Sequence, residues 1–177
     1  MSIRAVNAED ADALRAFFAR IPEGDRTFFK DDVLDAELVA AWVRRGHGRR
    51  SVVTDADGTI CGFAAITPLH GWSSHVGELA LVVDPAYRGR GLGLALARNA
   101  LLEAVRLGLT KVVVEVVPDQ EHAIRILQEL GFTPEALLRD QIRDQAGRLR
   151  DLIVLAHSVD DTWSAMATAG IDEAIGE

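Results

Sequence analysis

The stretch from Val76 to Gly108 constrains this chain most, because it joins a strand, a sharp stop, a glycine-rich turn and a long helix. Residues 76–83 (VGELALVV) form an apolar run of the length of a buried strand. Asp84-Pro85 ends this run, since proline has no N–H for a sheet and disfavours helix in the residue before it. Glycines at the entrance of the next helix leave backbone N–H groups unpaired and uncovered at the positive end of the helix dipole. The stretch therefore predicts a phosphate site, best suited to a pyrophosphate.

Three known phosphate-binding turns are alternatives for this signal. A P-loop ends in Gly-Lys-Ser/Thr, which this stretch lacks. A dinucleotide fingerprint needs a third glycine where Leu94 stands, and its turn leaves the strand directly. Glu115 lies at a suitable distance to hold a ribose, but in the middle of a strand rather than at its tip. The third alternative fits the whole string.

The segment VDPAYRGRGLG closely resembles the acyl-CoA-binding motif of the GNAT N-acetyltransferase superfamily, whose pattern is Gln/Arg-x-x-Gly-x-Gly/Ala. Arg88, Gly91 and Gly93 meet this pattern. The resemblance implies acetyl-CoA as co-substrate, with its pantetheine arm between two splayed parallel strands and an N–H near Val82 polarising the thioester carbonyl. It implies cofactor-binding roles for Leu81, Val82, Val83, Arg88, Gly89, Arg90, Gly91, Leu92, Gly93, Leu94, Gln120 and Ala123.

A second segment, residues 120–132, is similar to another GNAT motif, Asn-x-x-Ala-x-x-Leu-Tyr-x-x-x-Gly-Phe, through Ala123, Gly131 and Phe132. Gln120 replaces the asparagine and keeps an amide. Leu127 stands where many members place the tyrosine that protonates the departing thiolate, and we expect it to border the pantetheine channel. Within the superfamily, IPEGDRTFF and LRDQIRD…GRLRDLIVLAH resemble bacterial protein lysine acetyltransferase domains.

The remaining pattern predicts one domain over residues 1–158 and a loosely helical tail over 159–177. We expect an α/β (α+β) fold: a mixed, mostly antiparallel twisted sheet with a central parallel strand pair and helices on both faces. The expected strands are 2–6, 50–54, 59–67, 76–83, 111–117, 137–143 and 148–157. We expect four helices. The first is capped by Asn7, and the second begins near Asp31 or Asp32 with Leu34 on its buried face. The third follows the glycine-rich turn and runs to Leu107, and the fourth is capped by Asp119 and runs to Leu130.

Composition excludes several classes of protein. The 177 residues are 49% apolar, which suits one domain with a sizeable core. A net charge of −8 argues against nucleic acid as a partner. No apolar stretch is long enough for a membrane span, and the N-terminus lacks the hydrophobic region of a signal peptide. A single cysteine, Cys61, makes the cytoplasm the expected compartment. No cluster has metal-ligand spacing, so we expect no metal.

Glu78 is the best candidate for a general base, because it is an ionisable residue inside an otherwise apolar strand. It resembles the glutamate with which many GNAT relatives deprotonate the amine. The alternative is a salt-bridged glutamate at the solvated end of the strand. We interpret His70, His75 and His122 as solvated side chains, and Cys61 as a small core residue.

The sequence thus predicts an N-acetyltransferase that moves an acetyl group from acetyl-CoA directly to a primary amine of a protein or a small molecule. The alternative is a GNAT-like acyl-CoA sensor without turnover, which the missing tyrosine supports. Acceptor specificity is expected in the loops 22–32, 68–75 and 135–147. The tail is either a partner surface or frayed, and a homodimer is compatible with the first reading.

Overall fold

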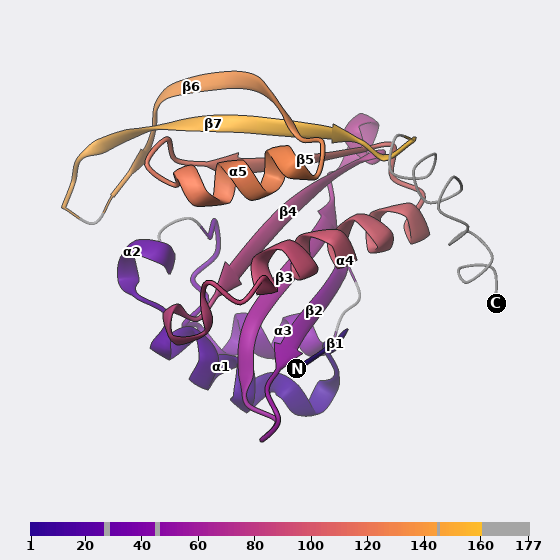
Figure 1. The fold of residues 1–177 in the computed structure, drawn as a ribbon, viewed down its shortest axis with the longest axis vertical. Helices are drawn as coiled ribbons and strands as arrows, with labels where there is room; N and C mark the ends of the chain where they lie inside the picture. The colour runs from indigo at the N-terminus through magenta and orange to yellow at the C-terminus, as the bar shows by residue number, and fades with distance from the viewer. Residues whose placement is uncertain (27–28, 45–46, 145, 161–177) are drawn as a thin grey trace.

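A computed structural model of the chain describes residues 1–26, 29–44, 47–144 and 146–160. One seven-stranded sheet runs through these residues in the order β1-β2-β3-β4-β5-β7-β6 (Figure 1). All neighbouring strands are antiparallel except β4 and β5. The strands are β1 Ser2–Ala5, β2 Arg49–Thr54, β3 Ile60–Pro68, β4 Val76–Val83, β5 Lys111–Val116, β6 Thr133–Arg143 and β7 Leu149–Ser158.

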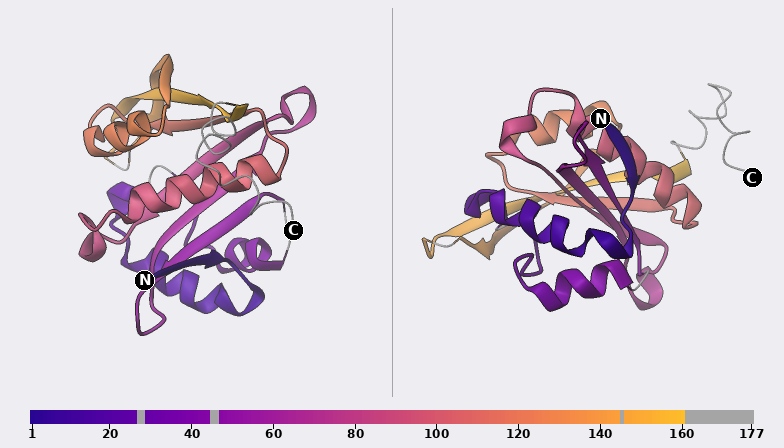
Figure 2. Two further views of the ribbon diagram at one scale, coloured as in Figure 1. Left: turned by 45° about the vertical axis from the view of Figure 1, so that its right-hand side comes forward. Right: turned by 90° about the horizontal axis from the view of Figure 1, so that it is seen from below.

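Helices cover both faces of this sheet, as the sequence predicts (Figure 2). One face packs on α1 and α3 around Phe18 and Phe63, and the other packs on α4 and α5 around Leu101 and Leu127. The helices are α1 Ala11–Arg20, α2 Glu23–Arg26, α3 Ala36–Arg44, α4 Leu92–Arg106 and α5 Glu121–Glu129, with short 3-10 turns η1 Ala8–Asp10, η2 Gly71–Ser73 and η3 Pro85–Tyr87.

The two central strands pair over only part of their length. β4 and β5 are in register at three positions, from Val76 opposite Lys111 to Glu78 opposite Val113. Beyond these positions the strands diverge, which Figure 1 shows as β4 slanting away from β5. We call the diverging part, Leu79–Val83 of β4 with residues 114–116 of β5, the β4–β5 splay. It is closed at Glu78 and open at the end of β4 that leads to the glycine-rich turn.

Two predicted helix starts are wrong. The helix expected from Asp31 or Asp32 begins at Ala36, because Asp32 Oδ1 accepts from Leu34 N at 3.0 Å and Asp35 Oδ1 from Glu37 N at 2.9 Å. These side-chain bonds form a turn before the helix, and Leu34 is exposed rather than buried. Asp119 does not cap α5: Gln120 occupies the cap position, and Asp119 pairs with Arg150 instead. The short helix α2 lies where the sequence predicts only a stop.

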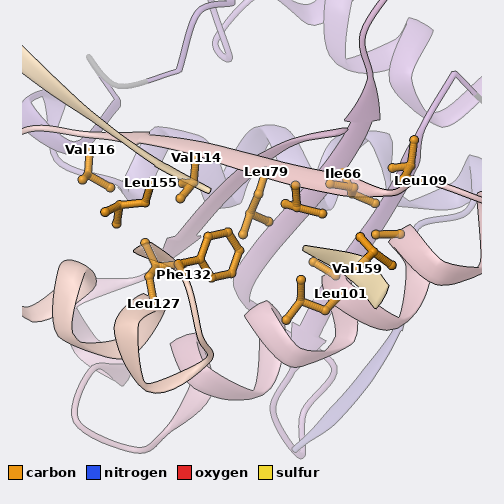
Figure 3. Packing of buried hydrophobic residues seen from close by; sticks show 13 residues of the cluster. Ile66, Leu79, Leu101, Leu109, Val114, Val116, Leu127, Phe132, Leu155 and Val159 are labelled. Carbon is orange, nitrogen blue, oxygen red and sulfur yellow. The ribbon is translucent and has the colours of Figure 1, made fainter. Parts of the chain in front are cut away.

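Leu127 lies in the hydrophobic core and not at the border of a channel, which corrects the expectation for this position. It is 5% exposed and belongs to the cluster of buried side chains on the α4–α5 face of the sheet. Figure 3 shows Leu127 and Phe132 directed toward Val114 and Leu155 of the strands. The core is continuous here, since the cluster also includes Leu79 of β4, Val112 of β5 and Val159.

The C-terminal part of the tail, residues 161–177, lies outside the described residues, and so does its predicted helical character. Val159, at the predicted boundary, is 4% exposed in the core, and its N–H donates to Thr110 O at 3.0 Å. Within the part of the chain that the structure describes, no helix is both long and apolar enough to cross a membrane.

Candidate active site

The glycine-rich turn enters α4 in a conformation that suits glycine. Gly89 has φ 73° and Gly91, the N-cap of α4, has φ 75°, both in the left-handed region. A Cβ atom built on either residue would meet no atom within 4 Å, so the space above the turn is open. The first hydrogen bond of α4 runs from Ala95 N to Gly91 O at 3.0 Å, which leaves the earlier N–H groups of the helix without intrahelical partners. This end can receive a phosphate group.

Both arginines of the turn bind protein atoms. Arg88 Nε donates to Val83 O at 3.2 Å, and its Nη2 lies 2.5 Å from Asp25 Oδ2 in α2. Arg90 Nη2 donates to Ala86 O at 3.3 Å, with its guanidinium 5.1 Å from the centre of the Tyr87 ring. The turn is thereby tied to the end of β4 and to α2. Leu92 is largely buried, so its side chain belongs to the core.

The hydrogen bonds between β4 and β3 determine which N–H groups of β4 face the β4–β5 splay. Asp84 N donates to Cys61 O and Leu69 N donates to Val76 O, so even-numbered residues at both ends of β4 bond to β3. The register between the strands is unbroken from Gly62–Val83 to Pro68–Gly77. Since bonded and non-bonded pairs alternate in an antiparallel ladder, Val82 also faces β3. The N–H groups of the odd-numbered residues, Leu81 among them, face the splay, whereas the N–H of Val82 does not.

Glu78 lies at the closed end of the splay, in contact with a lysine. Its side chain is 26% exposed and lies on the face of the sheet that α1 and α3 cover. Lys30 Nζ is 2.5 Å from Glu78 Oε1 and 3.2 Å from Glu115 Oε1, so one ammonium connects the two diverging strands. Glu115 comes from β5 with its side chain 28% exposed. The two carboxylates and the lysine form what we call the Glu78–Lys30–Glu115 cluster.

An aromatic group holds Lys30 in this place. The preceding residue, Phe29, packs edge-on against Phe18 with ring centres 5.6 Å apart and lies 6.3 Å from Phe63. Burial alone would lower the pKa of Lys30, but hydrogen bonds and charge attraction from Glu78 and Glu115 outweigh it, and the pKa is raised. The lysine is therefore an ammonium ion across the neutral range.

The structure also shows the surroundings of the other residues that were considered in the sequence analysis. Gln120 Oε1 accepts from Val117 N at 3.3 Å, so this amide closes the turn before α5. Ala123 is half-buried in the first turn of that helix. Cys61 is fully buried, its thiol donates to Val53 O at 3.3 Å, and burial raises its pKa, which agrees with a core residue. His70 stacks on His47 with ring centres 5.0 Å apart. Among the described residues no group of three or more His, Cys, Asp or Glu could hold a metal.

Three residues that contact the predicted site residues were not identified from the sequence. They are Lys30 and Glu115, which meet beside Glu78, and Asp25, which pairs with Arg88. Only Lys30 carried a signal. It is one of two lysines in a chain whose other 17 basic residues are arginines.

A mixed sheet with one splayed parallel pair, followed by an open glycine-rich turn, is the framework of an acyl-CoA-dependent N-acyltransferase. The model of the Acetyltransferase (GNAT) family matches residues 12–132. The chain therefore belongs to the GNAT acetyltransferase family.

Curated relatives match over most of the chain. An L-methionine sulfoximine/L-methionine sulfone acetyltransferase of Salmonella typhimurium is 27% identical over 91% of this chain and 96% of its own length. The L-amino acid N-acyltransferase MnaT of Escherichia coli is 25% identical over 91% of this chain and 95% of its own length.

Solved structures share the fold. A GCN5-related N-acetyltransferase from Kribbella flavida superposes with a TM-score of 0.76 at 28% identity, covering 89% of this chain and 96% of its own. The Salmonella typhimurium acetyltransferase yncA, solved with its cofactor acetyl-CoA, has a TM-score of 0.77 at 22% identity, covering 90% and 94% of the two chains.

Proposed function

We propose that this enzyme transfers an acetyl group from acetyl-CoA directly to a primary amine, with Glu78 as general base. One observation carries the proposal: β4 places Glu78 at the closed end of the β4–β5 splay and ends five residues later at Val83, where η3 leads on to the glycine-rich turn. Five strand residues span roughly 16 Å. One extended co-substrate can therefore reach the turn with its pyrophosphate and Glu78 with its thioester.

Each step falls to a residue of the chain. The N–H groups of the turn hold the pyrophosphate, and Arg88 and Arg90 add positive charge beside it. The Leu81 N–H, which faces the splay, donates to the thioester oxygen as negative charge develops on it. Glu78 takes the proton that the amine must lose before it can attack. Acetyl-CoA supplies the activated acetyl group.

The departing thiolate receives no proton from α5, because Leu127 cannot donate one. A thiol has a pKa of about 8.5, so a thiolate can leave unassisted and take a proton from solvent afterwards. Loss of a general acid typically costs about 10²-fold or more in rate, which slows turnover without abolishing it.

We propose a small amine as the acceptor, with free amino acids as the leading class. Two curated relatives that match over 91% of this chain are named for amino acids or amino-acid analogues. Phe29, which is half-buried next to Lys30 on the same face as Glu78, provides an apolar contact for a side chain. A lysine or N-terminus of a protein is the second acceptor class.

We place the reaction in the cytoplasm because the one cysteine is a free thiol.

A panel of acceptors tests this proposal through release of free CoA thiol. The panel contains L-amino acids with methionine sulfone, polyamines, aminoglycosides and lysine peptides. We expect turnover with at least one α-amino acid, and a higher kcat/KM for it than for any peptide. Turnover with peptides alone would reject the acceptor class but keep the reaction.

A second function, an acyl-CoA sensor without turnover, is favoured by one observation: Leu127 fills the place of the family tyrosine with a buried apolar side chain. Tight binding of acetyl-CoA by calorimetry, together with no thiol release across the whole panel, would favour the sensor.

A further inference from the structure

The proposed reaction leaves one reactive group unexplained, the amine of Lys30. Its ammonium is already in contact with the carboxylate that we assign as general base, at 2.5 Å. The chain has only one other lysine, Lys111, and that residue pairs with Glu135 on β6 at 2.5 Å. The two lysines therefore differ in one respect that matters here: only Lys30 touches Glu78.

The position of Lys30 matches the place where an acceptor amine must lie. The thioester belongs at the closed end of the β4–β5 splay, and Glu78 stands at that end. The Lys30 side chain, which is 60% exposed, reaches across the splay to Glu115 on β5. Phe29 packs edge-on against Phe18, which anchors the main chain next to Lys30 in the aromatic group.

We propose that Lys30 is an internal acceptor, and that the enzyme acetylates its own Lys30 from acetyl-CoA when no other amine occupies the site. This inference rests on the proposed function, because it uses the same thioester position and the same base. It adds a modification site within the chain.

The reaction balances with these groups alone. Glu78 accepts one proton from the Lys30 ammonium, and the neutral amine attacks the thioester carbon. A C–N bond forms and the C–S bond breaks. The amide nitrogen loses a second proton, and the CoA thiolate takes one up. The products are N-acetyl-Lys30, CoA thiol and one proton released to solvent.

The same ion pairs that hold the amine also keep it protonated, so the reaction is slow. Glu78 and Glu115 raise the pKa of Lys30, which lowers the fraction of free amine at neutral pH. The rate of self-acetylation should therefore increase with pH through the whole neutral and mildly alkaline range.

Acetylation would change the site after it happens. An acetylated lysine carries no charge, so its ion pairs with Glu78 and Glu115 are lost. Glu78 is then released for an external amine, so the modified enzyme should have a lower KM for a cationic acceptor.

Mass spectrometry of the intact full-length protein tests the inference. Wild type, Lys30→Arg, Lys111→Arg and Glu78→Gln are incubated with acetyl-CoA and no acceptor, and the modified residue is mapped on peptides. The urea-denatured wild type gives the rate of purely chemical acetylation. Lys30→Arg should fold normally, because the residue is exposed and arginine keeps the charge.

We expect wild type and Lys111→Arg to gain one acetyl group at Lys30, at least tenfold faster than the denatured chain. The first-order rate constant of this modification should be independent of protein concentration. Lys30→Arg should gain none, and Glu78→Gln should be slowed about 10²-fold or more. Equal rates of acetylation at Lys30 and Lys111, or a first-order rate constant that increases with protein concentration, would overturn self-acetylation in cis.

The outcome also separates this inference from the proposed function. If the same preparation releases CoA thiol with a free amine but leaves Lys30 unmodified, self-acetylation is wrong and the acetyltransferase proposal stands. If neither the free amines nor Lys30 are acetylated, both proposals fail.

Discussion

Lys30 Nζ lies 2.5 Å from Glu78 Oε1, and this contact joins a segment that follows α2 to the strand at the centre of the sheet. The pair has a direct consequence for substrate binding. A cationic acceptor must displace Lys30 from Glu78 before the carboxylate can take its proton. Lys30 therefore competes with the acceptor for the same partner.

Replacing Lys30 with methionine should strengthen binding of cationic acceptors. Ion pairs at such exposed positions contribute about 1 kcal/mol or less, so we expect the KM for the acceptor to fall by about fivefold or less. The acetyl-CoA affinity should not change. Lys111→Met is the matched control, because it removes the only other lysine from outside the site. An increased KM in Lys30→Met alone would mean that Lys30 binds the acceptor instead of competing with it.

Gly91→Asp should abolish tight binding of acetyl-CoA. The substitution places a negative side chain beside N–H groups that are oriented for an anion, and we expect a loss of about 3 kcal/mol, or roughly 10²-fold in Kd. Isothermal titration calorimetry measures the effect. Gly58→Asp is the control, since Gly58 also has positive φ (82°) and open space around it but lies in the β2–β3 turn. Equal affinity in Gly91→Asp and wild type would place the phosphate site elsewhere.

Leu127→Tyr should destabilise the protein rather than improve catalysis. Leu127 is buried in the α4–α5 cluster, and a larger side chain with a hydroxyl group overpacks such a site at a cost of about 1–3 kcal/mol. Thermal unfolding checks this cost, with Gln128→Tyr as the control at an exposed position of the same helix. An unchanged Tm together with an increased kcat would show that the side chain reaches the thiolate, contrary to its burial here.

The stability of the fold should depend on Asp10 above pH 4. Asp10 accepts from both Nη atoms of Arg4 at 2.7 Å and from Asn7 N at 2.8 Å, and the Arg4 hydrogen bonds lower its pKa. A lowered pKa in the folded state stabilises the fold above the unfolded value of about 3.9, and this stabilisation is lost as the pH falls through the lower folded value.

Asp10→Asn should therefore cost about 2 kcal/mol in free energy of unfolding at pH 7 and progressively less below pH 4. Urea denaturation at several pH values measures the difference. Asp12→Asn, at a side chain that is 96% exposed, is the control. A loss of stability that is the same at pH 3 and pH 7 would show that the charge of Asp10 is not its cause.

The parts of this fold that depend on adjacent residues could be predicted from the sequence. β4 begins and ends where the sequence predicts, at Val76 and Val83, because an apolar run and a following Asp-Pro define a strand locally. The start of α3 could not be predicted in the same way. Asp31, Asp32 and Asp35 are all good cap residues, and the sequence does not specify that the turn continues to Asp35 with Val33 buried in the core.

The Glu78–Lys30–Glu115 cluster could not be predicted, because its members come from distant parts of the chain. Lys30 and Glu115 are 85 residues apart and meet only through the sheet order and the packing of Phe29. The direction of the Leu81 N–H likewise follows from the strand register, which the sequence does not specify. Glu78 itself could be recognised, since a carboxylate within an apolar strand is visible in the sequence alone.

A comparison of Glu78→Gln with Glu115→Gln tests the central claim most directly. Both variants remove one carboxylate from the same lysine, but only Glu78 lies at the closed end of the β4–β5 splay. Thiol release with saturating acetyl-CoA and the best acceptor gives kcat, and calorimetry gives the acetyl-CoA affinity. We predict that Glu78→Gln lowers kcat about 10²- to 10⁴-fold at pH 7, with acetyl-CoA affinity nearly unchanged and a smaller loss at high pH, and that Glu115→Gln stays within about tenfold of wild type. A Glu78→Gln variant that turns over at the wild-type rate at pH 7 would contradict the account.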